Sequence, residues 1–439
     1  MPALWDRRMK LGPRSVPTLS GSVEVPGDKS VSHRALILSA LASGRSTVGG
    51  INLGDDVRAT ARMLGQLGAP CIFDLDNHEV QVEGPGWAGL HEPEELLDAG
   101  NSGTSMRLLL AVCSGIDGAS VLTGDASLRR RPMLRVVAPL RQMGARIDGR
   151  RYGDRAPLFV RGGDLAGLDY ESTVASAQVK TAVLLAGLRA SGSTWVREPA
   201  SSRDHTERML AAAGVAVERD GLRVGVIGGA QIRPMDWFVP GDVSAAMFFV
   251  VAALILPDSD LTISSVGLNP TRIAALDVLR RMGARIEVEA AGELSGEPTG
   301  ALRVRHSNLT GTEVLPEETP ALIDEIPALA IAATQAHGTT VIRGATELRV
   351  KESDRVSALA GGLTALGADV DELDDGLVIR GPAPLTGGAV ESHGDHRIAM
   401  AFAVAGLAAG ERVTVRDWSC VETSFPGFID VLDGVRKPS

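Results

Sequence analysis

The motif VPGDKS (Val25–Ser30) has a near copy later in the chain, VPGDVS (Val239–Ser244). The two agree at five of six positions and lie 214 residues apart, close to half of the 439-residue chain. Each is followed by a long apolar stretch that opens with small polar residues, a pattern typical of a capped, buried helix. The repetition predicts two similar domains, each opened by one copy of the motif.

Further helix starts of the same kind occur between and beyond these two motifs. The six expected starts lie near Ser30, Ser102, Ser176, Ser244, Asp324 and His396. A second recurring pattern alternates with these helix starts and consists of an apolar helix end, a glycine and then a β-rich stretch. Its glycines are Gly68, Gly144, Gly214, Gly283, Gly367 and, more weakly, Gly434. Glycine just past a helix supplies the left-handed conformation that ends it. Six units of about 70 residues, each with two helices and intervening strands, account for the chain; chance similarity of helix ends is the alternative.

The starts of these six helices are rich in Ser, Asn, Thr and Asp, the residues that cap helix N-termini. A helix N-terminus also carries the positive end of the helix dipole, which favours anions. If the N-termini converge, the chain contains a site suited to a multiply charged anion.

Composition indicates a globular protein of two or three domains, with 44% hydrophobic and 22% charged residues. The longest apolar runs, 245–256 and 398–409, are shorter than the roughly 20 residues that a membrane helix needs. The first 14 residues lack the apolar core of a signal peptide, so we expect a cytoplasmic protein without a membrane partner. Neither a disulfide framework nor a cysteine-based metal site is expected from three widely spaced cysteines, Cys71, Cys113 and Cys420.

The charge pattern argues against a nucleic-acid partner, and the few lysines of the chain fall at informative positions. The net charge is −10 and aromatic residues make up 3%, which leaves little for phosphate contacts or base stacking. Only five of the 44 basic residues are lysines, and two of these lie near the termini. The three interior lysines, Lys29, Lys180 and Lys351, all fall inside the motifs described next. Arginine does not replace lysine where a compact ammonium is needed.

The segment GDKSVSHR (27–34) places Lys29, Ser30 and Arg34 at a helix start, where they could hold phosphate or carboxylate oxygens. A capped helix with a solvated arginine explains the same residues equally well. The GxxxxGK[ST] spacing of a P-loop is absent.

Three more segments of the first half repeat this chemistry. In NSGTSMR (101–107), Gly103 would let a ligand approach the backbone, although a plain helix cap is nearly as good an explanation. In GDASLRRRP (124–132), the proline makes Arg131 the best candidate for an ordered anion contact, although such a run is usually a solvated loop. Hydroxyl, amide and guanidinium donors suited to a phosphate monoester follow in SAQVK (176–180) and SRDH (202–205).

The second half contributes carboxylates as well as cations, in DEIP (324–327), ELRVKESDR (347–355) and GDHR (394–397). Lys351, Glu352 and Arg355 offer a cation, a proton donor and an anion clamp; an exposed, salt-bridged segment is the alternative. His393 and His396 lack a third ligand nearby, so no metal site is expected.

Taken together, these motifs resemble those of the 5-enolpyruvylshikimate-3-phosphate synthase family of enolpyruvyl transferases. The resemblance runs from about Val23 to Phe428 and rests on GDKSxSHRAL, NSGTxMR, SAQVKxAxLLAGL, SRDHTE, KESDR and GDHRxAM, in that order. It implies an α/β fold of two similar domains, each built from three βαββαβ units. The first domain would span 28–240 and the second 1–27 plus 241–439, with hinge crossovers near 26–28 and 239–242.

Members of that family transfer the enolpyruvyl group of phosphoenolpyruvate to the 5-hydroxyl of shikimate 3-phosphate and release phosphate, in the biosynthesis of chorismate and the aromatic amino acids. The resemblance therefore implies a cytoplasmic transferase, expected to be a monomer, that closes over two small-molecule substrates. It implies no metal and no organic cofactor.

The family's roles carry over motif by motif. The resemblance assigns Asp324 as the proton acceptor, Glu352 as the proton shuttle at C3 of phosphoenolpyruvate, and Lys29 as a catalytic residue that touches both substrates. The implied shikimate 3-phosphate contacts are Lys29, Ser30, Arg34, Ser176, Ala177, Gln178, Arg203, Asp324 and Lys351. The implied phosphoenolpyruvate contacts are Lys29, Gly103, Arg131, Gln178, Arg355 and Arg397.

The chain departs from the family pattern at three positions. Some relatives carry a lysine just before the final (S/T)FP segment, where this chain has Thr423. Many relatives have asparagine where this chain has Glu347, so we assign no ligand role there. Ala177 stands where others have serine, which leaves only a backbone contact.

Two alternatives are an enzyme of the same fold and a protein of a different functional class. UDP-N-acetylglucosamine enolpyruvyl transferase shares the implied fold but uses a reactive cysteine in a mobile loop, and the comparable loop here, 124–132, contains none. A non-catalytic protein that only holds a phosphorylated ligand would explain every motif as a helix cap. The paired carboxylates Asp324 and Glu352 argue for chemistry, because binding an anion has little use for them.

Overall fold

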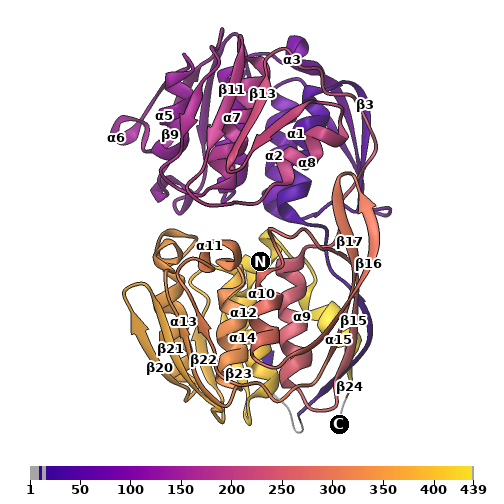
Figure 1. Cartoon of the computed structure of the whole chain (residues 1–439), viewed down its shortest axis with the longest axis vertical. Helices are drawn as coiled ribbons and strands as arrows, with labels where there is room; N and C mark the ends of the chain where they lie inside the picture. Colours follow the sequence, from indigo (N-terminus) through magenta and orange to yellow (C-terminus); the bar gives the residue numbers. More distant parts are fainter. Residues whose placement is uncertain (1–8, 12–15, 438–439) are drawn as a thin grey trace, which may run out of the picture. The chain divides into compact units, whose positions relative to one another are not determined.

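The computed structural model describes residues 9–11 and 16–437, which group into two compact domains (Figure 1). The first domain comprises 27–240 together with 293–297. The second comprises the described residues up to 26, then 241–292 and 298–437. Residues 293–297, at the tip of a hairpin, belong to the first domain. The domain boundaries expected from the sequence analysis do not include this segment.

Within the described ranges the strands form six sheets, three in each domain. Those of the first domain have the orders β14-β3-β5-β4, β6-β7-β9-β8 and β10-β11-β13-β12. Those of the second have the orders β16-β17-β15-β2-β24, β18-β19-β21-β20 and β1-β23-β22. The α/β architecture of two three-unit domains is therefore confirmed.

The first domain contains three units in succession. The first unit comprises α1 (Lys29–Leu41), β3 (Ser43–Gly49), α2 (Asp55–Gln66), β4 (Cys71–Asp74) and β5 (Glu79–Pro85). The second comprises β6 (Leu97–Asp98), α4 (Gly103–Ser114), β7 (Ala119–Thr123), α5 (Leu134–Gln142), β8 (Arg146–Gly149) and β9 (Arg155–Arg161). The third comprises β10 (Asp169–Glu171), α7 (Ala177–Arg189), β11 (Ser193–Arg197), α8 (His205–Ala212), β12 (Val217–Asp220) and β13 (Arg223–Ile227).

The second domain repeats this plan. Its first unit comprises β2 (Thr18–Glu24), α9 (Val243–Ile255), β15 (Asp260–Gly267), α10 (Ala274–Arg281), β16 (Arg285–Leu294) and β17 (Glu297–Arg305). Its second comprises β18 (Glu313–Val314), α12 (Ile326–Thr334), β19 (Gly338–Ile342), α13 (Arg355–Ala365), β20 (Asp369–Leu373) and β21 (Gly376–Gly381). Its third comprises β22 (Gly388–Glu391), α14 (His396–Ala408), β23 (Val413–Arg416), α15 (Phe428–Val435), β24 (Arg436–Lys437) and β1 (Met9–Leu11).

The order of elements inside a unit corrects the expected βαββαβ. A complete unit such as 97–161 runs β-α-β-α-β-β, and its first two strands, β6 and β7, are parallel. Parallel neighbours require a crossover connection, which here is the buried helix α4. The last two strands, β8 and β9, form an antiparallel pair that needs no intervening helix of that length.

Two leading strands are exchanged where the chain passes between domains. β2 precedes α1 in sequence but pairs with β15, and β14 (Trp237–Phe238) precedes α9 but pairs with β3. Beside these crossings the Asp28 N–H donates to the Pro240 carbonyl at 2.7 Å in the first domain. A Cβ on Gly27 would stand 2.0 Å from the Gly50 carbonyl oxygen, so this position of the VPGDKS motif requires glycine.

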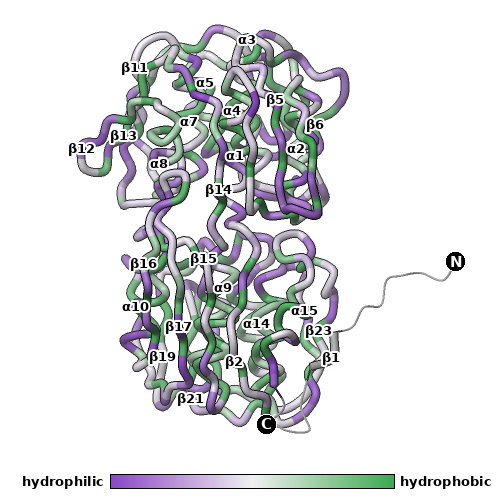
Figure 2. Tube along the Cα trace, turned by 90° about the vertical axis from the view of Figure 1, so that its right-hand side faces the viewer, coloured by the Kyte–Doolittle hydropathy of each residue, from purple (hydrophilic) through white to green (hydrophobic). Residues whose placement is uncertain are grey.

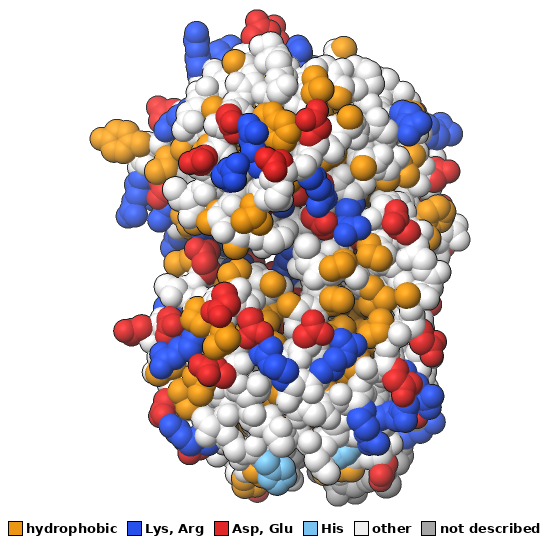
Figure 3. Space-filling model, viewed as in Figure 1, with side chains coloured by type: hydrophobic (Ala, Val, Ile, Leu, Met, Phe, Trp, Pro, Cys, Tyr) orange, Lys and Arg blue, Asp and Glu red, His pale blue; other side chains and the backbone are white. Residues whose placement is uncertain are grey.

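The six unit-opening helices, α1, α4, α7, α9, α12 and α14, are buried on nearly all sides, as their apolar sequences predict. In α9, for example, every residue from Val243 to Leu254 is buried. Figure 2 shows hydrophobic segments concentrated within each domain and hydrophilic segments along the outer strands and loops. Among the described residues, none of the helices combines the length and apolarity needed to cross a bilayer. On the face shown in Figure 3, acidic and basic side chains are interspersed.

Candidate active site

The candidate residues of the first domain lie at the N-termini of α1, α4 and α7. The side chains of Asp28, Ser102 and Ser176 cap these helices by accepting the N–H groups of Val31, Ser105 and Val179. Short polar caps are what the sequence predicts at these positions. The three capped ends present backbone N–H groups and the positive ends of three helix dipoles, the features that bind phosphate.

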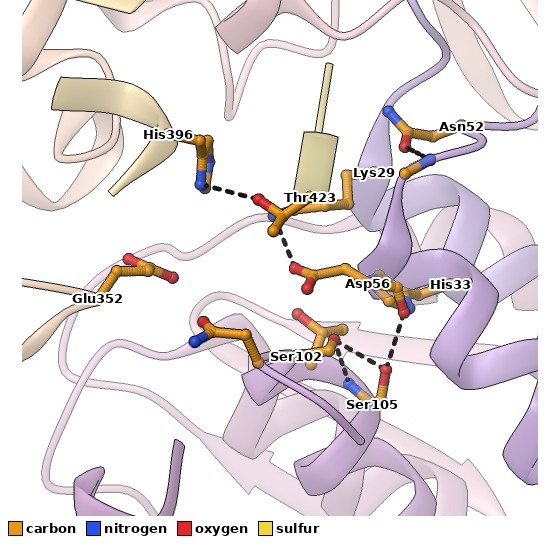
Figure 4. Close-up of polar contacts among 12 residues, drawn as sticks. Lys29, His33, Asn52, Asp56, Ser102, Ser105, Glu352, His396 and Thr423 are labelled. Atoms are coloured by element: carbon orange, nitrogen blue, oxygen red, sulfur yellow. Dashed lines mark hydrogen bonds and ion pairs between the residues drawn. The ribbon is translucent and has the colours of Figure 1, made fainter. Parts of the chain in front are cut away.

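Lys29, at the first position of α1, is held by a carboxylate that the sequence analysis did not single out. Its Nζ donates to Asp56 Oδ2, at the start of α2, over 2.9 Å (Figure 4). The Lys29 side chain is 17% exposed and that of Asp56 is 13% exposed. The ammonium is therefore oriented before any ligand arrives and remains accessible to one.

The N-termini of α4 and α7 are joined by side-chain contacts. Gln178 donates to the Thr104 hydroxyl at 2.9 Å and accepts from Arg107 at 2.5 Å. Arg131, which is buried, donates to the side-chain oxygen of Asn101 at 2.5 Å. The guanidinium of Arg131 passes so close to Gly103 that an added Cβ there would lie 3.3 Å from its Nη1. The predicted residues Gly103, Arg131 and Gln178 are thus adjacent.

Arg34 is 4% exposed, so it is not the solvated arginine of the alternative interpretation. Its guanidinium donates to the Thr206 hydroxyl, the Ser30 carbonyl and the Thr181 hydroxyl, at 2.7–2.9 Å. Burial, followed by the repulsion of Arg203, lowers the pKa of Arg34 to about 10, although Glu207 and Asp28 oppose the shift. Arg34 is still a cation at neutral pH and ties α1 to α7 and α8.

In the second domain Asp324 lies among three cations. Its Oδ1 is 3.6 Å from Lys351 Nζ and 3.3 Å from Arg355 Nη1, and its Oδ2 is 4.0 Å from Arg397 Nη2. Arg397 also donates to the Asp324 backbone carbonyl at 2.9 Å. The Asp324 side chain is 13% exposed and that of Lys351 is 30% exposed, so the cluster faces solvent on one side.

Arg355, 1% exposed, holds this cluster together. Its Nη2 donates to Glu352 at 2.6 Å, and its Nε donates to Asp395, the cap of α14, at 2.7 Å. Burial alone would lower the pKa of Arg355, but Asp395, Glu352 and Asp324 outweigh it and raise the pKa above its ordinary value. The guanidinium therefore stays charged and positions both carboxylates that the sequence analysis proposes for proton transfer.

The structure groups the predicted residues by domain and adds partners that sequence patterns did not reveal. Lys29, Ser30, Arg34, Gly103, Arg131, Ser176, Ala177, Gln178 and Arg203 belong to the first domain. Asp324, Lys351, Glu352, Arg355 and Arg397 belong to the second. Asp395 lies in the GDHR motif and Asp56 in the first turn of α2, but neither position signals which cation it contacts. At the departure from the family pattern, the Thr423 hydroxyl lies 3.5 Å from His396 Nδ1 (Figure 4).

Among the described residues, no group of three or more His, Cys, Asp or Glu side chains is arranged to hold a metal ion.

His33, fully buried in α1, gives the protein a pH-dependent stability. Its Nδ1 is 2.7 Å from the Thr60 hydroxyl. Burial, and then the charges of Lys29 and Arg34, hold the pKa of His33 well below its ordinary 6.5, against the opposing charge of Asp28. The folded protein therefore keeps His33 neutral at a pH where the unfolded chain protonates it, so stability falls as pH drops below about 6.5.

We expect the H33Q variant to lose this dependence. Below the unfolded pKa, one extra proton on the unfolded chain lowers the free energy of unfolding by up to about 1.4 kcal/mol per pH unit. Urea unfolding of both proteins between pH 7.5 and 5.5 measures the difference. Parallel pH profiles for the two proteins would show that His33 is not the responsible group.

Comparison with known proteins agrees with this arrangement of motifs. The family profile described as EPSP synthase (3-phosphoshikimate 1-carboxyvinyltransferase) matches residues 13–432. This chain belongs to the EPSP synthase family. Among curated members, the 3-phosphoshikimate 1-carboxyvinyltransferase of Synechococcus sp. (strain JA-3-3Ab) is 53% identical over 424 residues, covering 96% of this chain and 95% of the relative. The enzyme of that name from Gloeobacter violaceus is 54% identical over 420 residues, covering 95% and 97%.

Two solved structures have the same fold as this chain. An EPSP synthase from Acinetobacter baumannii superposes with a TM-score of 0.87 at 42% identity, covering 98% of each chain. The enolpyruvyl transferase NikO from Streptomyces tendae reaches a TM-score of 0.79 at 19% identity, covering 98% of this chain and 99% of its own. This second likeness concerns the fold alone.

Proposed function

We propose that this protein transfers the enolpyruvyl group of phosphoenolpyruvate to the 5-hydroxyl of shikimate 3-phosphate and releases phosphate, a step in chorismate and aromatic amino-acid biosynthesis. The family membership supports the reaction. The observation that carries it is the pair of carboxylates, Asp324 and Glu352, held by one buried guanidinium among further cations. A protein that only bound an anion would gain nothing from carboxylates there.

The first domain supplies most of the contacts proposed for shikimate 3-phosphate: Lys29, Ser30, Arg34, Ser176, Ala177, Gln178 and Arg203, with Asp324 and Lys351 from the second domain. The capped N-terminus of α7 and the hydroxyl, amide and guanidinium donors beside it suit a phosphate monoester with neighbouring hydroxyls. Arg34 also positions the surrounding helices, because three of its N–H groups are used inside the domain.

Phosphoenolpyruvate carries a phosphate and a carboxylate, and the residues proposed for it are Lys29, Gly103, Arg131, Gln178, Arg355 and Arg397. Gly103 has no side chain to separate a ligand from Arg131, which lies directly beside it. Each charged hydrogen bond of this kind contributes about 1.5–3 kcal/mol.

The proposed chemistry has two stages. Asp324 accepts the proton of the 5-hydroxyl while the hydroxyl oxygen forms a bond to C2 of phosphoenolpyruvate. In the same stage Glu352 donates a proton to C3. In the resulting tetrahedral intermediate, Glu352 takes a proton back from C3 as the C2–O bond to phosphate breaks, which restores the double bond. Lys29 and the arginines stabilise the negative charge that collects on the departing phosphate.

The cysteines argue against the transferase that acts on UDP-N-acetylglucosamine through a reactive thiol. Burial raises the pKa of Cys71, Cys113 and Cys420 to about 12. Since the thiolate is the nucleophile, these three side chains are poorly suited to that role.

The proposal is tested by measuring phosphate release from phosphoenolpyruvate, with and without shikimate 3-phosphate, in buffer containing a metal chelator. Release that depends on shikimate 3-phosphate and persists with chelator is the expected result. Release with UDP-N-acetylglucosamine in its place, or no release from correctly folded protein, would overturn the assignment.

We also propose that the domains close over the two substrates, because expelling water strengthens the electrostatic interactions at the reacting atoms. Small-angle X-ray scattering should show a smaller radius of gyration when shikimate 3-phosphate and an unreactive phosphoenolpyruvate analogue are both present. An unchanged radius at saturating concentrations would contradict closure.

The proposal further places the enzyme in the cytoplasm as a monomer. Both substrates are multiply charged, and such molecules stay in the compartment where they are made because burying ions in a bilayer is strongly unfavourable.

A further inference from the structure

Lys180, Glu198 and Glu207 form a buried ion-pair triad next to the segments that carry proposed shikimate 3-phosphate contacts. Lys180, in the buried helix α7, is 3% exposed. Its Nζ lies 2.9 Å from Glu198 Oε2 and 2.8 Å from Glu207 Oε1, and both glutamate side chains are at most 4% exposed. Lys180 is the interior lysine to which neither the motifs nor the proposed chemistry assign a role.

Glu198 differs from Glu207 in what else it touches. Its Oε1 accepts the backbone N–H of Ser176 at 2.8 Å, and its Oε2 accepts the Ser202 hydroxyl at 2.8 Å as well as the Lys180 ammonium. Ser176 is the cap of α7, and Ser202 immediately precedes Arg203. One carboxylate therefore fixes both chain segments that carry the proposed phosphate contacts.

Electrostatics explains why Lys180 lies beside the Glu198 carboxylate. A buried anion beside a phosphate site would repel the phosphate, and an unpaired buried carboxylate is itself strongly unfavourable. The Lys180 ammonium pairs with Glu198 and offsets part of the negative charge, while the carboxylate accepts three hydrogen bonds. Glu207 is in α8, and its contact with Lys180 joins α7 to α8.

We propose that Glu198, held by Lys180, is a positioning residue for phosphate recognition: it sets the Ser176 cap and the Ser202–Arg203 segment in the geometry that binds shikimate 3-phosphate. The inference rests on the proposed function, because it takes these segments as the phosphate contacts. Glu207 contacts Lys180 but neither the Ser176 N–H nor the Ser202 hydroxyl, and its charge acts on Arg34, so it provides a comparison within the same triad that leaves these two segments in place.

The test compares E198Q with E207Q. A glutamine amide at 198 cannot satisfy all three donors, because its NH₂ group faces either the Ser176 N–H or the Lys180 ammonium. Loss of this alignment should raise KM for shikimate 3-phosphate about tenfold, while KM for phosphoenolpyruvate stays within about twofold and kcat within about threefold. E207Q should leave KM for shikimate 3-phosphate within about twofold, whatever its effect on thermal stability.

Calorimetric titration of each variant with shikimate 3-phosphate separates binding from turnover. An equal rise in KM for both variants, or a fall in kcat without weaker binding of shikimate 3-phosphate, would overturn the proposal. If E198Q does not fold, E198D keeps the charge but is one methylene shorter, and it should show the same selective rise. If the wild-type protein binds shikimate 3-phosphate but releases no phosphate, the proposed function fails while the titrations still test the positioning role.

Discussion

Replacing Asp324 by asparagine should lower kcat by about 10²- to 10⁴-fold, the range for removal of a general base. The substitution keeps the shape of the side chain but leaves no group to accept the 5-hydroxyl proton. Shikimate 3-phosphate should still bind nearly normally, because the contacts proposed for its phosphate lie on other residues. Initial rates of phosphate release give kcat, and calorimetry gives the affinity for shikimate 3-phosphate.

A suitable control is D369N, which removes an exposed carboxylate from β20 of the same domain. Asp369 pairs with Arg380 on the surface, and its side chain is 64% exposed. Surface ion pairs contribute about 0–1 kcal/mol, so D369N should retain normal turnover. A D324N variant with the rate of the wild-type protein would remove Asp324 from the mechanism.

The second large effect is expected at the arginines of the second domain. Both R355M and R397M should raise KM for phosphoenolpyruvate at least about tenfold, since each removes a charged contact worth about 1.5–3 kcal/mol. Only R355M should also unfold readily. It leaves Asp395, Glu352 and Asp324 without the buried cation that they share, and breaking a buried ion pair costs about 3–5 kcal/mol.

Steady-state kinetics with varied phosphoenolpyruvate and urea unfolding of both variants separate the two roles. Arg397 is 9% exposed and donates to the Asp324 backbone carbonyl, so its removal leaves less buried charge unpaired. Equal losses of stability in R355M and R397M would show that Arg355 does not hold the carboxylates together. An unchanged KM in both would exclude these arginines as phosphoenolpyruvate contacts.

The repeated architecture could be predicted because it depends on local signals. Helix caps, glycines after helix ends and the two VPGD motifs recur at regular intervals, and each has a local physical cause. The order of strands within a unit was predicted wrongly. The leading strands Leu97–Asp98 and Glu313–Val314 have two residues each, too few to show any periodicity, and they are recognisable only from their parallel pairing.

The resemblance implies which domain each leading strand belongs to, but the sequence does not indicate which strand it pairs with. β2 and β14 each precede a helix of one domain and pair with a strand of the other, a choice made by long-range hydrogen bonding. The same holds for Glu297, whose carboxylate lies 2.8 Å from the buried His205 of the first domain although the segments on either side of 293–297 belong to the second.

The sequence by itself determined the number of units and the buried helices, because these follow from patterns along one segment at a time, and its motifs carried the resemblance that implies the family and the site residues. Only the tertiary structure decided which charges meet. Lys29 faces Asp56, Arg355 joins three carboxylates, and Lys180 lies between two glutamates. Such pairings depend on how distant helices pack, and burial then decides whether an ion pair fixes the geometry of a site or is merely solvated.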